Sequence, residues 1–200
     1  MSFNSPSSRV GWLILIFILP LILVTACRRI GAGNYETPTY GVLQSDGPYE
    51  IRDYPASTLV STTAQKRGEN GAFMRLFHFI SGRNEKSEKI AMTVPVLMSG
   101  STPETMSFVM PARVVKNGVP NPSDPSLNIT AMPGGHYAAY RFSGRARQAQ
   151  FGESVSKLQT WMMRHDLSPI GSPVLAVYDP PWTPGFMRHN EVLIPLASTR

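Results

Sequence analysis

The sequence predicts an α+β fold, in which a twisted antiparallel sheet of about eight strands is flanked by two helices. Eighteen of the 200 residues are proline, nearly double the usual share, which favours strands and loops over a helical bundle. Short runs rich in β-branched residues end at proline turns, and two longer stretches carry apolar residues at helical spacing. The order of these elements occurs twice, so we expect a pseudo-twofold duplication of a ββαββ unit.

The first half begins with two predicted strands, 49–54 and 57–64, on either side of a proline turn at Pro55. A helix is predicted over 71–81, because its apolar residues recur at helical spacing and Gly82 is a suitable C-cap. Two further strands are predicted within 89–98 and 105–115. Because the turns between strands are short, we expect antiparallel pairing of the strands that they join.

The second half repeats this order. Strands are predicted on either side of Pro133, which occupies the place of Pro55 in the first half. A longer helix is predicted within 145–167, with one apolar face, and the strands 172–179 and 190–198 follow. Both "SFVMP" and "EVLIP" end on proline, which supports the duplication.

The N-terminus carries a targeting signature. Arg9 precedes fifteen uncharged residues, 12–26, which are too few for an ordinary membrane-spanning helix and are interrupted by Pro20. The stretch "VTAC" before and including Cys27 resembles the bacterial lipobox, in which a cysteine is lipidated after cleavage. The alternative is an uncleaved anchor helix, which the positive charge after the segment disfavours.

Cys27 is the only cysteine, so the chain forms no intramolecular disulfide. An exported lone thiol would be a liability, whereas a lipidated cysteine is an anchor. We therefore expect lipidation at Cys27, with residues 1–26 as signal peptide or N-terminal membrane anchor, 27–40 as a tether and 41–198 as one folded domain.

Charge and motifs exclude several functions. The net charge is +6, but no Lys/Arg run exceeds two residues, so we expect no nucleic-acid partner. The sequence has no HExxH pair, Cys–His metal spacing, P-loop, GxSxG elbow or GxGxxG fingerprint. The prediction is therefore a protein that is not an enzyme and has no catalytic residues.

Apolar side chains occur where a soluble protein does not need them. The helix 71–81 has apolar groups around more of its girth than one core stripe requires, and the proline-rich loop 179–190 carries Trp182, Phe186 and Met187. The helix and the loop could form the two walls of a ligand cleft, or could pack on each other without a cavity. The polar groups that could line such a cleft are Arg75, His78, Arg83, Tyr178 and Arg188.

Three stretches resemble the signature sequences of the SOUL/haem-binding protein family: "IAMTVPV" (90–96), "PNPSDPSLNI" (120–129) and "VYDPPWTPGFMRHNEV" (177–192). The resemblance in order and spacing covers about residues 40–196. It implies a twisted antiparallel sheet of about eight strands with two helices, similar to the effector-binding domains of some bacterial transcription regulators. It also implies binding of haem or another tetrapyrrole as a ligand, not as a catalytic cofactor.

Family members place the proposed haem cleft between the first helix and the proline-rich closing loop. By motif position the resemblance assigns Met74, Phe77 and His78 on the helix, and Tyr178 and Trp182 at the loop. Arg75, Arg83 or Arg188 would then pair with the haem propionates. His78 is a candidate axial ligand to iron, although the family does not have histidine there throughout, and a packing role is the alternative. The chain also has "RHNEV" where relatives commonly have "RRNEV", so His189 replaces a cation beside the expected cleft.

Taken together, these features predict an exported, membrane-anchored haem-binding protein of the bacterial envelope, periplasmic or in the outer membrane as a lipoprotein. One alternative is a module that binds another small hydrophobic ligand. A buried glutamate is frequent where such modules bind cations, and none is found among the expected cleft residues. Another alternative is an interaction lipoprotein whose aromatic loop docks onto a partner or a membrane surface.

Overall fold

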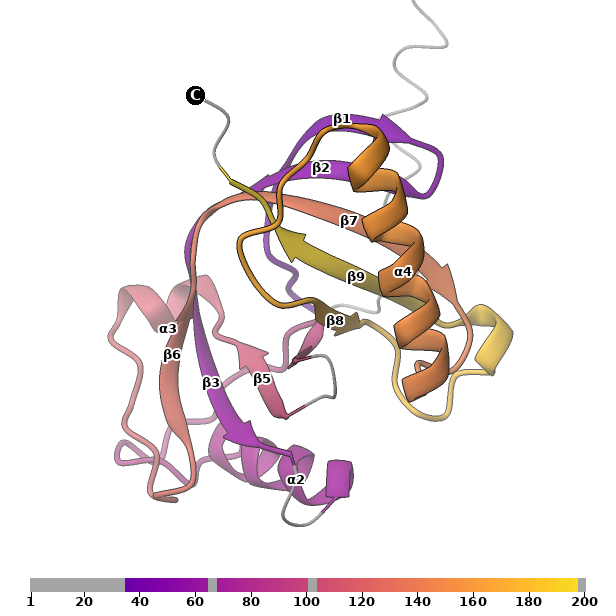
Figure 1. Ribbon diagram of the computed structural model, residues 1–200. Coiled ribbons are helices and arrows are strands. Elements are labelled where there is room, and N and C mark those ends of the chain that lie inside the picture. The colour runs from indigo at the N-terminus through magenta and orange to yellow at the C-terminus, as the bar shows by residue number, and fades with distance from the viewer. Residues whose placement is uncertain (1–34, 65–67, 101–103, 198–200) are drawn as a thin grey trace, which may run out of the picture. The chain divides into compact units, whose positions relative to one another are not determined.

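The computed structural model describes residues 35–64, 68–100 and 104–197 (Figure 1). These residues belong to one compact unit, Gly33–Arg200. Its strands are β1 Gly41–Asp46, β2 Tyr49–Tyr54, β3 Ser57–Thr63, β4 Val96–Ser99, β5 Thr105–Val109, β6 Asn128–Met132, β7 Gly135–Ser143, β8 Val174–Val177 and β9 His189–Pro195. Its helices are α2 Gly68–Ile80, α3 Ala112–Lys116, α4 Gln148–Arg164 and the 3₁₀ helix η1 Gly185–Met187.

The nine described strands form one sheet in the order β1-β2-β7-β9-β8-β4-β5-β3-β6, and all neighbouring strands are antiparallel. The two halves correspond as β2 to β6, β3 to β7, β4 to β8 and β5 to β9. Exchanging these counterparts reverses the order of the eight strands from β2 to β6 across the sheet. The pseudo-twofold axis therefore passes between β4 and β8. This symmetry matches the predicted duplication of a ββαββ unit, and the predicted α+β class is confirmed.

The two strands on either side of each proline bend do not pair with each other, although hairpins were expected there. β2 pairs with β7 and β3 pairs with β6, so each half contributes its first strand to the second strand of the other half. The segments 49–63 and 128–143 thus run antiparallel along their length and bend together at Pro55 and Pro133. At this crossing a Cβ on Gly134 would come within 2.7 Å of the Ala56 nitrogen, so only glycine fits without a shift of the backbone.

The sheet has a core on each of its faces. α2 packs on β3 and β5, and α4 packs on β7 and β9 (Figure 1). Buried side chains of both helices join one core cluster, so the two helices cover the same face of the sheet. This face holds the larger core cluster, which includes Leu76, Phe108 and Trp161. Alternate residues of the same strands point to the other face, where a smaller cluster forms around Tyr54, Leu97 and other residues.

The N-terminal segment 35–40, which was predicted to be part of the tether, lies against this second face. Glu36 forms a parallel bridge with Thr93, and the ring of Tyr40 packs on Tyr54 with ring centroids 4.9 Å apart. Residues 27–34, the predicted signal segment and Cys27 lie outside the described residues. None of the helices in the described ranges is long and apolar enough to cross a membrane.

Other differences from the predicted elements are local. β1 is a ninth strand at the edge of the sheet, and all six of its residues are exposed, so it has no apolar alternation that could reveal it. Several strands are shorter than predicted: β4 begins only at Val96, after a cis Val94–Pro95 bond, the chain after Met110 forms α3, β8 spans only Val174–Val177, and β9 ends at Pro195.

Candidate functional site

The outward side of α2 carries the site residues predicted on the helix. At 3.6 residues per turn, Met74, Phe77 and His78 fall within about 100° of the helix circumference. Met74 is 43% exposed and Phe77 is 42% exposed, whereas Leu76 and Phe79 on the opposite side are fully buried. The structure therefore brings these three predicted residues together as one solvent-facing stripe, and we call this the α2 stripe.

The end of α2 places a cation beside His78. Gly82 has a φ of +110°, and the Gly82 and Arg83 N–H groups donate to the carbonyls of Phe79 and His78. These two bonds form a Schellman motif, which confirms Gly82 as the predicted C-cap. The motif turns the chain back so that Arg83 lies next to the last turn of the helix.

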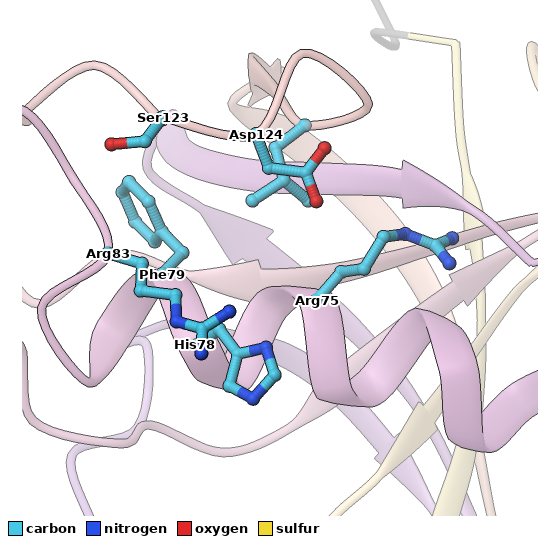
Figure 2. Close-up of a pocket in the computed structure, with 7 residues that line it drawn as sticks. Arg75, His78, Phe79, Arg83, Ser123 and Asp124 are labelled. Carbon is cyan, nitrogen blue, oxygen red and sulfur yellow. The ribbon is translucent and has the colours of Figure 1, made fainter.

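A cavity of about 190 Å³ lies on this flank of α2, between the helix and the loop 121–127 (Figure 2). Its lining residues are Arg75, His78, Phe79, Arg83, Ser123, Asp124 and Leu127. Pockets that enclose a drug-sized ligand usually measure about 300–1,000 Å³. This cavity is therefore large enough for a carboxylate-sized group and too small for a whole macrocycle.

The basic side chains that line the cavity differ in whether they are bonded to the protein. Arg75 Nε donates to Thr62 Oγ1 at 3.1 Å and Arg75 Nη2 donates to the Thr63 carbonyl at 2.6 Å, which fixes the guanidinium at the end of β3. Within the described ranges, neither Arg83 nor the His78 imidazole has a side-chain hydrogen bond or ion pair. Arg83 and His78 are therefore available to a ligand, and Arg75 is a positioned charge.

The opposite wall of the cavity is held by its own polar bonds. Glu85 accepts hydrogen bonds from the Asn121 backbone and side-chain nitrogens, both at 2.9 Å. These bonds lower the pKa of Glu85 below its usual value. Asp124 accepts from the Ser126 N–H and hydroxyl in a tight turn. The loop 121–127, which forms this wall of the cavity, is thus bonded to the segment that follows α2.

The closing loop is clamped at its neck. The rings of Tyr178 and His189 stack with centroids 4.3 Å apart and planes within 3°, and Asp179 accepts from the His189 N–H. Arg188 donates to the carbonyls of Pro181 and Thr183 within the same loop. Arg188, which was predicted to contact a ligand, therefore bonds two carbonyls of its own loop.

The tip of the closing loop points to solvent. Trp182 is 80% exposed and Phe186 is 81% exposed. η1 contacts β7, whereas α2 lies on β3 and β5 in the other half of the sheet. A Cβ on Gly185 would lie 3.4 Å from Arg145 Cγ, so Arg145 lies against this part of the loop. The structure thus does not bury the predicted loop wall against α2.

Beneath the neck of the loop lies a buried ion pair that sequence reasoning missed. Arg52 and Glu191 are each 1% exposed, and two hydrogen bonds of 2.7 and 2.9 Å join them. Arg52 also donates to Glu50 at 2.8 Å and to the Tyr54 hydroxyl at 3.0 Å. The Tyr40 ring covers the guanidinium at 4.3 Å, a cation–π contact. We call these residues, together with Tyr178 and His189, the Arg52 network.

Glu191 connects the network to the closing loop. The Tyr178 hydroxyl donates to Glu191 Oε2 at 2.8 Å, and His189 Nε2 lies 2.9 Å from Oε1. Because an ionised carboxylate only accepts, His189 donates this bond. His189, which the sequence placed beside the expected cleft, therefore bonds the buried carboxylate of Glu191.

The environment of the Arg52 network shifts its ionisation. Burial alone would raise the pKa of Glu191, but the hydrogen bonds from Arg52 and His189 and the charge of Arg52 outweigh burial and hold this pKa far below its usual value. Burial, reinforced by the charge of Glu191, raises the pKa of Tyr178 well above its usual value. The carboxylate is thus ionised and already paired, so Glu191 is not a free anionic site for a cationic ligand.

The predicted site residues therefore fall into three places. Met74, Phe77, His78 and Arg75 lie at α2, Tyr178 belongs to the Arg52 network, and Trp182, Phe186 and Arg188 form the closing loop. The sequence signal for Glu191 was a charged residue inside an otherwise apolar strand, and its partner Arg52 is 139 positions away. In the described part of the chain no group of three His, Cys, Asp or Glu side chains converges as a metal site.

Relatives with curated names match this chain over different lengths. "Heme-binding protein 1" of Xenopus tropicalis is 24% identical over 174 residues, which cover 81% of this chain and 91% of the relative. "Heme-binding protein 2" of Homo sapiens is 39% identical over 79 residues, or 36% of this chain and 38% of the relative.

Solved structures share the fold at low sequence identity. The C-terminal domain of EcmrR has a TM-score of 0.55 at 10% identity, over 80% of this chain and 99% of that domain. A crystal structure described as a hydrolase from Listeria innocua has a TM-score of 0.53 at 12% identity, over 78% of this chain and 94% of that chain. At these identities the similarity is one of fold alone.

The profile of the family described as SOUL heme-binding protein matches residues 35–195. This range begins with the segment that covers the Arg52 network and ends with β9, so it includes both halves of the duplication, α2 and the closing loop. The chain belongs to the SOUL heme-binding protein family.

Proposed function

We propose that the protein binds haem or a related tetrapyrrole on the α2 stripe, without a catalytic step. The observation that carries this proposal is the position of the His78 imidazole, between exposed apolar side chains and a cavity with two guanidinium groups. The family and the names of its relatives supply independent support.

The residues present fit the chemistry of the ligand. Met74 and Phe77 offer an apolar surface to the face of a macrocycle, and apolar contact of this kind is the main source of affinity in such sites. The cavity is large enough for one propionate, where Arg83 would pair with the carboxylate and Arg75 would add positive charge. The imidazole of His78 could supply a nitrogen ligand to the iron of a bound haem.

The closing loop remains a predicted second wall. Trp182 and Phe186 are exposed, so they could contact a ligand only if it reaches beyond the α2 stripe or if the loop moves. We assign the first contacts of the ligand to α2. The proposed role is to buffer, store or pass on the tetrapyrrole.

The test is a titration with hemin, followed by the Soret absorbance. The protein should give a saturable Soret shift at micromolar concentration, and His78→Ala should change the position or shape of the band. His165→Ala is the matched control, because His165 stands at the C-terminal end of α4, the counterpart of α2. Absence of a saturable shift for the unsubstituted protein would exclude haem binding, and equal spectra for both variants would exclude iron ligation by His78.

We further propose that the protein is exported and anchored in a membrane through its N-terminus. The support is the uncharged run 12–26 after Arg9 and the lone Cys27 after it. In a bacterial host, metabolic labelling with palmitate should label the protein, and Cys27→Ser should abolish the label. A product that keeps Met1 and carries no label would show an uncleaved anchor instead.

A further inference from the structure

We infer that the tip of the closing loop is a docking surface for an anionic lipid bilayer. The tip consists of Trp182, Phe186 and Met187, which are 80%, 81% and 63% exposed. This inference does not depend on haem binding, because it concerns side chains that lie outside the α2 stripe and its cavity.

The composition of the tip is that of a membrane interface. Tryptophan is enriched at the boundary between lipid headgroups and acyl chains, where its ring is amphipathic. Large exposed apolar groups that lie within six residues of each other exceed what a free surface loop requires. Leaving them in water gains nothing, whereas burial in the headgroup region would remove their apolar area from water.

The loop satisfies many of its own polar groups, which lowers the cost of entering a lipid environment. Prolines 180, 181 and 184 have no N–H group to satisfy. The N–H groups of Thr183, Met187 and Arg188 donate to carbonyls of the same loop. The Arg188 guanidinium also turns inward, onto the Pro181 and Thr183 carbonyls. A backbone group without a partner is costly in lipid, so this internal bonding favours insertion of the tip.

The tip is also held in one shape before it meets a partner. The Tyr178–His189 stack closes the neck of the loop, and Glu191 fixes both rings from below. Because proline restricts φ and the neck is clamped, few degrees of freedom are lost when the tip docks.

The charges around the tip select the kind of membrane. Arg145 lies against Gly185 at the base of the tip, and Arg147 follows in the same exposed segment. The one acidic side chain of the loop, Asp179, accepts from the His189 N–H at the neck. The chain as a whole carries a net charge of +6. Arg145 therefore puts a positive charge at the base of the apolar tip, which is complementary to anionic headgroups and not to a neutral surface.

Tryptophan fluorescence of the full chain in vesicles tests this inference. A Trp12→Phe background leaves the buried Trp161 and the exposed Trp182 as emitters. The Trp182 signal is obtained by subtracting the emission of a variant that also carries Trp182→Phe. The vesicles are phosphatidylcholine alone or phosphatidylcholine with phosphatidylglycerol, each with and without brominated acyl chains as quenchers.

In the anionic vesicles we expect the Trp182 emission to shift to the blue and to be quenched by bromine. Arg145→Glu with Arg147→Glu should return the signal to that of phosphatidylcholine vesicles. Phe186→Ser should reduce quenching, and Met163→Ser is the matched control, since Met163 is 70% exposed on α4.

Two results would overturn the inference. In the first, Trp182 emission stays accessible to acrylamide and insensitive to bromine in both kinds of vesicle. In the second, hemin shields Trp182 without vesicles and Phe186→Ser weakens hemin affinity, which would assign the tip to the haem site. Failure of haem binding appears separately, as the absence of a Soret shift.

Discussion

Arg52 is the residue on which the second face of the sheet depends. Its guanidinium bonds Glu50, Tyr54 and Glu191 and is covered by the Tyr40 ring, so one side chain joins β2, β9 and the N-terminal segment. A buried ion pair adds little net stability over an apolar pair of the same shape, but breaking one partner leaves an uncompensated charge. The contribution of Arg52 therefore shows only when it is removed alone.

Arg52→Met should lower the free energy of unfolding by about 3–5 kcal/mol, because Glu191 would remain buried without its partner. Chemical denaturation measures this loss. Arg113→Met is the control, since the Arg113–Glu88 pair is exposed and should contribute about 0–1 kcal/mol. Equal losses in the two variants would show that the Arg52 pair is not effectively buried.

The ionisation of Glu191 makes stability depend on pH. Its folded pKa lies below the unfolded value of about 4.3, so its contribution is complete above that pH and is lost as the pH falls below it. The difference in unfolding free energy between the unsubstituted protein and Glu191→Gln should therefore narrow from pH 7 to pH 3. A difference that stays constant over this range would contradict the assigned shift.

Two of the three arginines with predicted ligand contacts, Arg83 and Arg188, should differ in how their removal affects hemin affinity. Arg83→Ala should weaken hemin affinity about ten-fold, the equivalent of one charge-assisted hydrogen bond of about 1.4 kcal/mol. Arg188→Ala should leave affinity unchanged, because Arg188 is bonded to its own loop. Soret titrations of the two variants distinguish these outcomes, and a larger effect at Arg188 would place the propionates at the loop.

At the scale of elements, the periodicity of the sequence was informative wherever one side of an element is buried. α2, α4 and the central strands were predicted because their apolar residues repeat with a helical or a strand period. β1 was missed because it is exposed on all its residues, and α3 was missed because a five-residue helix has too few turns to show a period. The exchanged pairing of β2 with β7 could not be predicted, because short turns favour the local hairpin.

The crossing of the two proline bends depends on the absence of a side chain at Gly134. Gly134→Ala should lower the free energy of unfolding by about 1–3 kcal/mol, because the added Cβ meets the Ala56 backbone at 2.7 Å. Gly152→Ala is the control: a Cβ at this position in α4 meets nothing within 4 Å, and it should stabilise the protein by about 0.5–1 kcal/mol. Tolerance of Gly134→Ala would mean that the bends can separate.

At the scale of the whole molecule, the duplication provides two similar helices with different surroundings. α2 has a stripe with an imidazole beside a cavity, while Trp161 of α4 donates to Asp46 in β1 and stacks on Tyr49 at 5.2 Å. The added strand β1 thus contacts α4 through Asp46, whereas the α2 stripe stays exposed to a ligand. Sequence could identify α2 and its residues, but not this asymmetry or the buried network, which arise from contacts between distant segments.

The most direct measurement of the central claim is a two-dimensional amide NMR spectrum of residues 33–200, recorded with and without hemin. Because haem iron is paramagnetic, amides near the ligand should broaden. We expect broadening over residues 74–83 of α2 and its C-cap and over 123–127, while the counterpart helix α4 stays unaffected. Broadening confined to α4 or to the strands around Arg52 would contradict the assignment of the site to α2.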